Sequence, residues 1–83
     1  VVEEFREPVV DVFEEEDHIL VVAEMPGIGV EDVRLDVKDD LLEITAEKGQ
    51  KKYRKEILLP RICPKEKIHM TCNNGMLEIK CVM

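Results

Sequence analysis

The chain has 83 residues, of which 45% are hydrophobic and 37% charged, with a formal net charge of −7. This size and balance indicate one folded domain rather than a disordered chain, and the acidic charge argues against binding to nucleic-acid phosphates, which needs clusters of Lys and Arg. No apolar run approaches the roughly 20 residues of a membrane helix, and Val1-Val2-Glu3-Glu4 lacks the basic start of a signal peptide, so we expect a cytoplasmic protein that does not bind membranes.

Short segments in which apolar and polar residues alternate recur along the chain. Their spacing of roughly eight to twelve residues is typical of an all-β sandwich. The predicted strands, in chain order, are Val9–Phe13, His18–Glu24, Val33–Lys38, Leu41–Glu47, Tyr53–Leu59, Ile68–Cys72 and Met76–Val82. No helix of ordinary length is indicated, so we expect a single all-β domain over residues 1–83.

The connections between these strands are marked by charge runs, Gly and Pro. Glu14–Asp17 predicts a solvated hairpin loop, without the Gly-containing spacing of a calcium loop. Gly27–Asp32 predicts a loop or a short helical turn, and it lacks the motifs of phosphate-binding loops. Lys48–Lys52 predicts a short basic loop, and Arg61–Lys67, which contains Pro64, predicts a connection across the domain.

The last two strands are joined by Asn73-Asn74-Gly75, and Asn-Gly between alternating strands is the strongest short-range signal of a β-hairpin. Both central residues of a type I′ turn need positive φ, which Asn and Gly tolerate. The resulting register pairs Asn73 with Met76, Cys72 with Leu77, Met70 with Ile79 and Ile68 with Cys81. One face is then apolar (Ile68, Met70, Cys72, Leu77, Ile79, Cys81) and the other mostly polar (His69, Thr71, Asn73, Met76, Glu78, Lys80, Val82).

The three cysteines do not form a disulfide framework or a C-x-x-C zinc motif, which favours a reducing compartment. In the predicted register, Cys72 and Cys81 lie four pairs apart, roughly 13 Å along the ladder, whereas the Cα atoms of a disulfide lie within about 7 Å. We therefore expect two separate buried thiols at these positions. Cys63 stands beside Pro64 in a loop, so we expect it to be exposed and open to oxidation or cross-linking.

Catalytic and metal-binding constellations are not evident in the sequence. The chain has no Ser and only two histidines, and His69 projects from the face opposite Cys72 and Cys81. The carboxylates fall on turns and outward strand positions, where burial does not tune their pKa values. Neither His18 nor His69 has a second His or Cys at ligand spacing. We predict no enzyme activity, no cofactor and no metal, which leaves a binding or assembly role.

The order of motifs resembles the α-crystallin domain of small heat shock proteins, from about Glu7 to Val82. The segments that carry the resemblance are EPVVDVFEEEDHILVVAEMPGIGVEDVRLDVKDDLLEITAEK, YRKEILLP and NNGMLEIK. The most specific are Ala23–Gly27 followed by Glu31-Asp32-Val33, Leu42-x-Ile44-x-Ala46-Glu47, the Leu-Pro that ends at Pro60, and Asn74–Leu77. The resemblance implies an immunoglobulin-like antiparallel β-sandwich of seven to eight strands. It also implies a protein that forms dimers or larger oligomers and holds unfolding client proteins without ATP.

In that family a groove between the third and the penultimate strand accepts an apolar I-x-I/V tail from a neighbour, and apolar client segments use the same surface. On this chain the resemblance implies a groove for a partner or client lined by Val33, Leu35, Val37, Ile68, Met70 and Cys72. An extended peptide fits such a slot, because alternate apolar side chains face it where two sheets part. The alternative is that these side chains only fill the core.

The chain departs from the family pattern in its oligomerisation elements. We expect residues 1–7 to be a short remnant of the apolar N-terminal arm, and we expect the domain to lack the C-terminal I-x-I/V tail, because no such motif occurs between the last predicted strand and Met83. The connection from Glu47 to Tyr53 is too short for the extra strand that many bacterial and archaeal members exchange. We expect dimerisation through an edge instead, either the first strand or the strand with Lys52, Arg54 and Lys55. Those cations would repel across a two-fold axis unless carboxylates pair with them, and Lys55 stands where Arg is common.

The leading hypothesis is therefore an ATP-independent holdase domain. The alternatives are an adaptor or co-chaperone of the p23-like sandwich type, and a structural assembly factor built on the same domain. The p23-like group usually carries tryptophan, and this chain has none.

Overall fold

The computed structural model describes residues 4–83, so residues 1–3 of the predicted N-terminal remnant lie outside the described residues. Its strands are β1 (Val9–Glu14), β2 (His18–Glu24), β3 (Val33–Lys38), β4 (Leu41–Lys48), β5 (Lys51–Leu58), β6 (Ile68–Asn73) and β7 (Met76–Val82). The helical elements of residues 4–83 are two 3₁₀ turns, η1 (Val30–Asp32) and η2 (Lys65–Lys67). All seven predicted strands are confirmed, with small differences at their ends.

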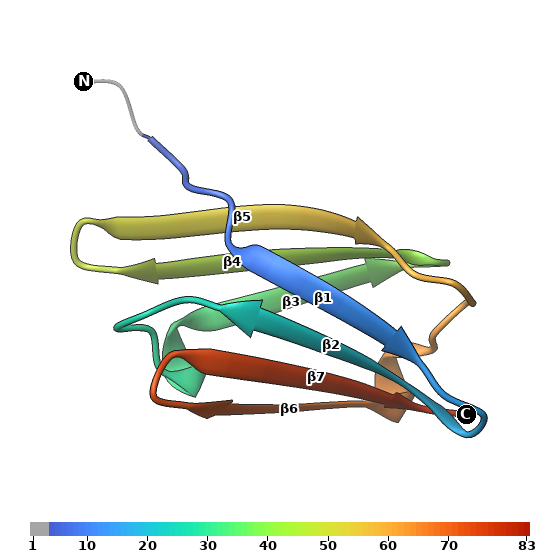
Figure 1. Ribbon diagram of the computed structural model, residues 1–83. Helices are drawn as coiled ribbons and strands as arrows, with labels where there is room; N and C mark the ends of the chain where they lie inside the picture. The colour runs from blue at the N-terminus through green and yellow to red at the C-terminus, as the bar shows by residue number, and fades with distance from the viewer. Residues whose placement is uncertain (1–3) are drawn as a thin grey trace.

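The strands form two antiparallel sheets that face each other as a sandwich (Figure 1). One sheet has the order β1-β2-β7-β6 and the other the order β3-β4-β5. The chain crosses between the sheets after β2, through η1, and again after β5, through η2. The predicted all-β sandwich is therefore confirmed, and β3 and β6, which the groove prediction requires, are both edge strands.

The core lies between the sheets, because every second residue of the central strands points inward. In β4, Leu42, Ile44 and Ala46 are fully buried and alternate with half-exposed or exposed residues. The matching positions of β2 and β7 are Ile19, Val21, Ala23, Leu77, Ile79 and Cys81, all buried. Burial of one such Ile or Leu side chain contributes about 1.5–3 kcal/mol, so this alternation is what selects the register of each strand.

The β6–β7 hairpin has the predicted register, with Cys72 opposite Leu77 and Ile68 opposite Cys81. Asn74 and Gly75 have φ values of 50° and 78°, as a type I′ turn requires. The predicted polar face of the hairpin is exposed at every position. The Asn-Gly signal therefore predicted both the turn and the faces of these two strands.

The predicted basic loop at Lys48–Lys52 is wrong. The β4–β5 turn consists of Gly49 and Gln50 alone, and Lys51 already pairs with Lys48 in the ladder. Gly49 has a φ of 60°, and this left-handed conformation lets a two-residue turn reverse the chain without a longer loop. The cationic side chains of this region therefore project from a strand.

The predicted state of the cysteines needs correction. Cys63 is bonded to Cys81, with Cα atoms 6.3 Å apart, and Cys72 is free. Cys63 is only 2% exposed, so the expectations of an exposed Cys63 and of a free thiol at Cys81 are both wrong. The connection after β5 turns this one side chain into the core, a tertiary placement that the spacing of strands does not predict. The predicted lack of a bond between Cys72 and Cys81 is confirmed.

Candidate binding groove and strand edges

The edge strands β3 and β6 lie on the same side of the sandwich, one from each sheet (Figure 1). Near one end, the Cys72 thiol of β6 donates a hydrogen bond of 3.3 Å to the carbonyl oxygen of Ile28, which precedes β3 in the chain. Near the other end the amide of Cys63 donates to the carbonyl of Asp39, which follows β3, at 3.4 Å. The groove predicted between β3 and β6 thus has two structurally distinct ends.

The six predicted groove residues all pack against the common core, but to different depths. Val33 is 8% exposed and belongs to the core itself. The other five, which alternate along the two strands, are half-buried: Leu35, Val37, Ile68, Met70 and Cys72. The arrangement offers a peptide a row of partly accessible apolar side chains, with polar neighbours such as Thr71 facing solvent.

The predicted dimer edge lies on β5, and each of its three cations has a carboxylate partner in the same chain. Lys52 pairs with Glu47 at 3.5 Å, Arg54 with Glu43 at 2.9 Å and Lys55 with Glu7 at 3.6 Å. The hydrogen bond and the charge of Glu43 raise the pKa of the Arg54 guanidinium above its ordinary value. The repulsion expected across a two-fold axis is therefore reduced by neutralisation within each chain.

The N-terminal segment occupies part of the same edge, which the sequence did not indicate. The amide of Arg6 donates to the carbonyl of Lys52 at 2.9 Å, and the amide of Arg54 donates to the carbonyl of Arg6 at 3.0 Å. The Lys52 ammonium also lies 5.9 Å from the centre of the Phe5 ring. A short parallel bridge at Tyr53 thus covers the first part of the otherwise open β5 edge.

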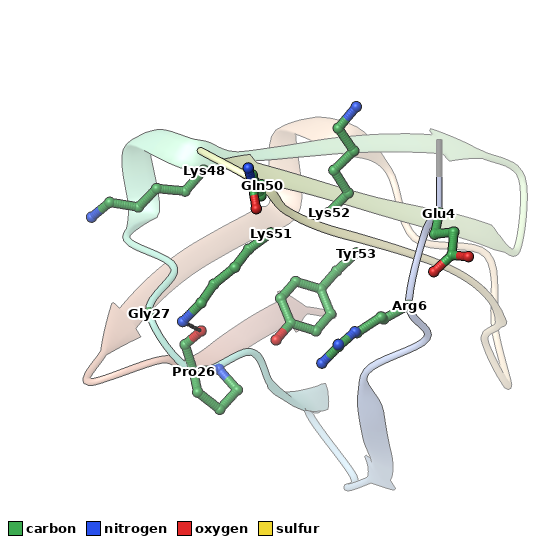
Figure 2. A pocket seen from close by; sticks show the side chains of 9 residues that line it. All are labelled: Glu4, Arg6, Pro26, Gly27, Lys48, Gln50, Lys51, Lys52 and Tyr53. Atoms are coloured by element: carbon green, nitrogen blue, oxygen red, sulfur yellow. Dashed lines mark hydrogen bonds between the residues drawn. The ribbon is translucent and has the colours of Figure 1, made fainter. Parts of the chain in front are cut away.

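Beside this bridge lies an open hollow of about 820 Å³ (Figure 2). Figure 2 shows the Arg6 guanidinium and the Tyr53 hydroxyl projecting into the same space, while Lys51 donates to the carbonyl of Pro26 at 3.2 Å. The lining residues are Glu4, Arg6, Pro26, Gly27, Lys48, Gln50, Lys51, Lys52 and Tyr53. Four cations against one carboxylate make this hollow locally basic in an acidic chain.

Residues 11–82 match the family model described as the Hsp20/alpha crystallin family. The chain belongs to this family. Members of the Hsp20/alpha crystallin family are chaperones without enzymatic activity, so membership assigns this domain a chaperone role.

Solved structures of small heat shock proteins share the fold of this Hsp20 domain. Heat shock protein 16.0 from Schizosaccharomyces pombe matches with a TM-score of 0.80 and 21% identity, over 94% of this chain and 67% of that one. The hspA protein from Xanthomonas axonopodis matches with a TM-score of 0.82 and 22% identity, over 95% of both chains. A small heat-shock protein from Xylella fastidiosa, described as having a distinct high order structure, matches with a TM-score of 0.75 and 21% identity, over 90% of this chain and 84% of that one.

Other site chemistry in the described part of the Hsp20 domain is sparse. No cluster of three or more His, Cys, Asp or Glu side chains suitable for a metal ion occurs within residues 4–83. His18 is hydrogen-bonded through Nδ1 to Asp17, and His69 is exposed on the outer face of β6. Among these residues no helix is long and apolar enough to cross a membrane.

Proposed function

We propose that this domain is an ATP-independent holdase that binds extended apolar segments of partly unfolded proteins in the groove between β3 and β6. The observation that carries the proposal is the alternation of half-buried apolar side chains on two facing edge strands. Such a row matches the period of an extended peptide, whose side chains point alternately inward and outward. The acidic exterior, with a net charge of −7, would keep a loaded complex soluble.

We also propose that the domain works as a homodimer or higher oligomer that forms through an edge strand. The β5 edge around Lys52, Arg54 and Lys55 has its cations neutralised, but Arg6 already binds its backbone. The β1 edge carries exposed apolar side chains at Val9 and Phe13. A dimer through β5 requires displacement of the Arg6 segment, whereas a dimer through β1 does not. Because family members are generally cytoplasmic, we propose that compartment for this chain.

The holdase proposal is tested by light scattering of a heat-aggregating client, without ATP, in the presence and absence of this chain. Suppression of scattering is expected at several-fold molar excess, and its absence would contradict the holdase function. Met70→Glu places a charge in the groove and should weaken suppression. Thr71→Glu introduces the same charge at the neighbouring exposed position of β6 and should not.

Equal activity of the two variants would show that clients bind elsewhere. Thermal unfolding of both variants checks that each is folded at the assay temperature. If Met70→Glu is not, Leu35→Glu tests the same groove from β3.

A further inference from the structure

We propose that the Cys63–Cys81 disulfide is a redox clamp on one end of the groove between β3 and β6, and that breaking it opens the groove. The consequence for clients rests on the holdase function proposed above, whereas the clamp itself does not. In the oxidised protein the Val37 and Ile68 end is held closed, and in the reduced protein it is released.

The position of the bond places it at this end of the groove. Cys81 lies in β7 directly opposite Ile68, the first residue of β6. Cys63 lies in the connection that leaves β5 in one sheet and enters β6 in the other. The bond therefore ties the crossing segment to β7, an interior strand of the four-stranded sheet.

The crossing segment has few other attachments. The connection is anchored at its β5 end, where Leu59 is buried and its amide donates to the carbonyl of Asp40 at 2.7 Å. Beyond Leu59, among residues 60–67, Cys63 is the only buried residue, and the side chains around it face solvent. The remaining hydrogen bonds from this segment to other elements, within residues 4–83, are the 3.4 Å bond from Cys63 to Asp39 and the 3.0 Å bond from Arg61 to Glu14. The first is long and the second joins exposed groups, so both are weak beside a covalent bond.

Release of this segment separates the two strands that line the groove. Asp39 follows directly on β3, and η2 leads directly into β6, so the segment bridges the ends of both strands. At the opposite end the Cys72 thiol is held by a single hydrogen bond to the Ile28 carbonyl, and because a thiol is a weak donor this bond is lost once β6 moves away from β3. The groove would therefore open from the Val37 and Ile68 end, by outward movement of the segment around Cys63.

The chemistry is thiol–disulfide exchange with a low-molecular-weight thiol and its disulfide. On oxidation the two cysteine thiols together lose two electrons and two protons, and the small disulfide takes them up as it splits into two thiols. On reduction a small thiolate attacks one protein sulfur to form a mixed disulfide, and a second thiol releases it. Because Cys63 and Cys81 are 2% and 3% exposed, exchange requires the segment to swing out first.

Cys72 supplies a reporter inside the groove. Oxidised wild-type protein has Cys72 as its single free thiol, and so does the double variant Cys63→Ala/Cys81→Ala. Both proteins are mixed with a small maleimide under native conditions, and the rate of modification is followed by mass spectrometry. We expect the double variant to react roughly tenfold faster or more, because loss of a cross-link lowers the free energy of local opening.

A matched control separates local opening from general loss of stability. Val21→Ala removes methyl groups from a buried position of β2 and leaves the disulfide intact. Its Cys72 should react at close to the wild-type rate. Equal rates in wild type and double variant would overturn the clamp, and so would equal acceleration in Val21→Ala. These rates are read without a client, so a failed clamp and a failed holdase function remain distinguishable.

Discussion

The amide of Met25 donates a hydrogen bond of 2.7 Å to the carbonyl of Gly75, which joins the end of β2 to the turn between β6 and β7. The two backbones approach so closely that a Cβ atom on Gly75 would lie 2.7 Å from Cα of Pro26 and 2.8 Å from the Met25 carbonyl oxygen. Gly75 also has a φ of 78°. Glycine is required here both for the conformation and for the space.

Gly75→Ala should therefore destabilise the domain more than Gly49→Ala does. Gly49 has a similar φ of 60°, but a Cβ atom added there would have no neighbour within 4 Å, so its substitution costs only the strain of the left-handed conformation, about 1–2 kcal/mol. At Gly75 the overlap with backbone atoms adds about 1–3 kcal/mol. Urea unfolding measures the free energy of unfolding of both variants. Equal decreases would show that the backbone around Pro26 moves away from the added Cβ atom without a cost in stability.

Reduction of the disulfide should lower the free energy of unfolding. The bond joins residues 18 apart in sequence. A cross-link that closes a loop of about 15 residues lowers the entropy of the unfolded chain and thereby stabilises the fold by roughly 3 kcal/mol. Urea unfolding with and without a phosphine reductant measures this loss. The Cys72→Ala variant should respond to the reductant like the wild type, since Cys72 is free. An unchanged midpoint would indicate that the bond contributes no net stability.

Arg6→Pro should expose the β5 edge, because proline lacks the amide that donates to Lys52. Loss of one hydrogen bond, worth about 1 kcal/mol, should speed hydrogen exchange at the Arg54 amide roughly fivefold. Arg6→Ala keeps both backbone hydrogen bonds and should leave this exchange rate near that of the wild type. Sedimentation then shows whether Arg6→Pro dimerises more strongly, as expected if the N-terminal segment blocks a β5 dimer.

The carboxyl group of Asp17 should titrate below its ordinary pKa of 3.8, because the ring of His18 is hydrogen-bonded to it at 2.7 Å. A carboxyl group whose pKa is lower in the folded than in the unfolded protein stabilises the fold at pH values above its pKa in the unfolded protein. This contribution is lost as the pH falls through the folded pKa. Carbon-13 NMR of the carboxyl gives the midpoint. His18→Ala should move it back toward 3.8 and His69→Ala should not, and a wild-type midpoint at or above 3.8 would contradict the pairing.

Local patterns predicted the parts of this fold that local physics determines. The alternation in β4 and β7 assigns each residue to a face, and Asn74-Gly75 fixes the register of the final hairpin because few residues tolerate its φ values. The Hsp20 resemblance supplied the proposed groove role of β3 and β6, which periodicity alone does not distinguish from other strands. The structure then showed that Val33 lies deeper than its neighbours on the predicted groove.

The errors concern residues whose surroundings come from distant parts of the chain. The charged and proline residues around Cys63 predict exposure, yet its burial depends on Cys81 of β7, which follows it by 18 residues. The bridge of Arg6 to β5 joins segments more than 40 residues apart and leaves no periodic signal. The run of cations around Lys51 suggested a loop. In the structure the turn has only two residues, and Lys51 already pairs with Lys48 in the β4–β5 ladder.

The place of β7 between β2 and β6 has a consequence for biosynthesis. The last strand of this sandwich to be synthesised is an interior strand of its sheet, and its pairing joins His18 to Val82. On the ribosome β1 and β2 can form only a hairpin, with one apolar face uncovered and one edge unpaired. Contacts of such long sequence separation form slowly, so this domain folds after its translation is complete and is itself a nascent chain in need of protection until then.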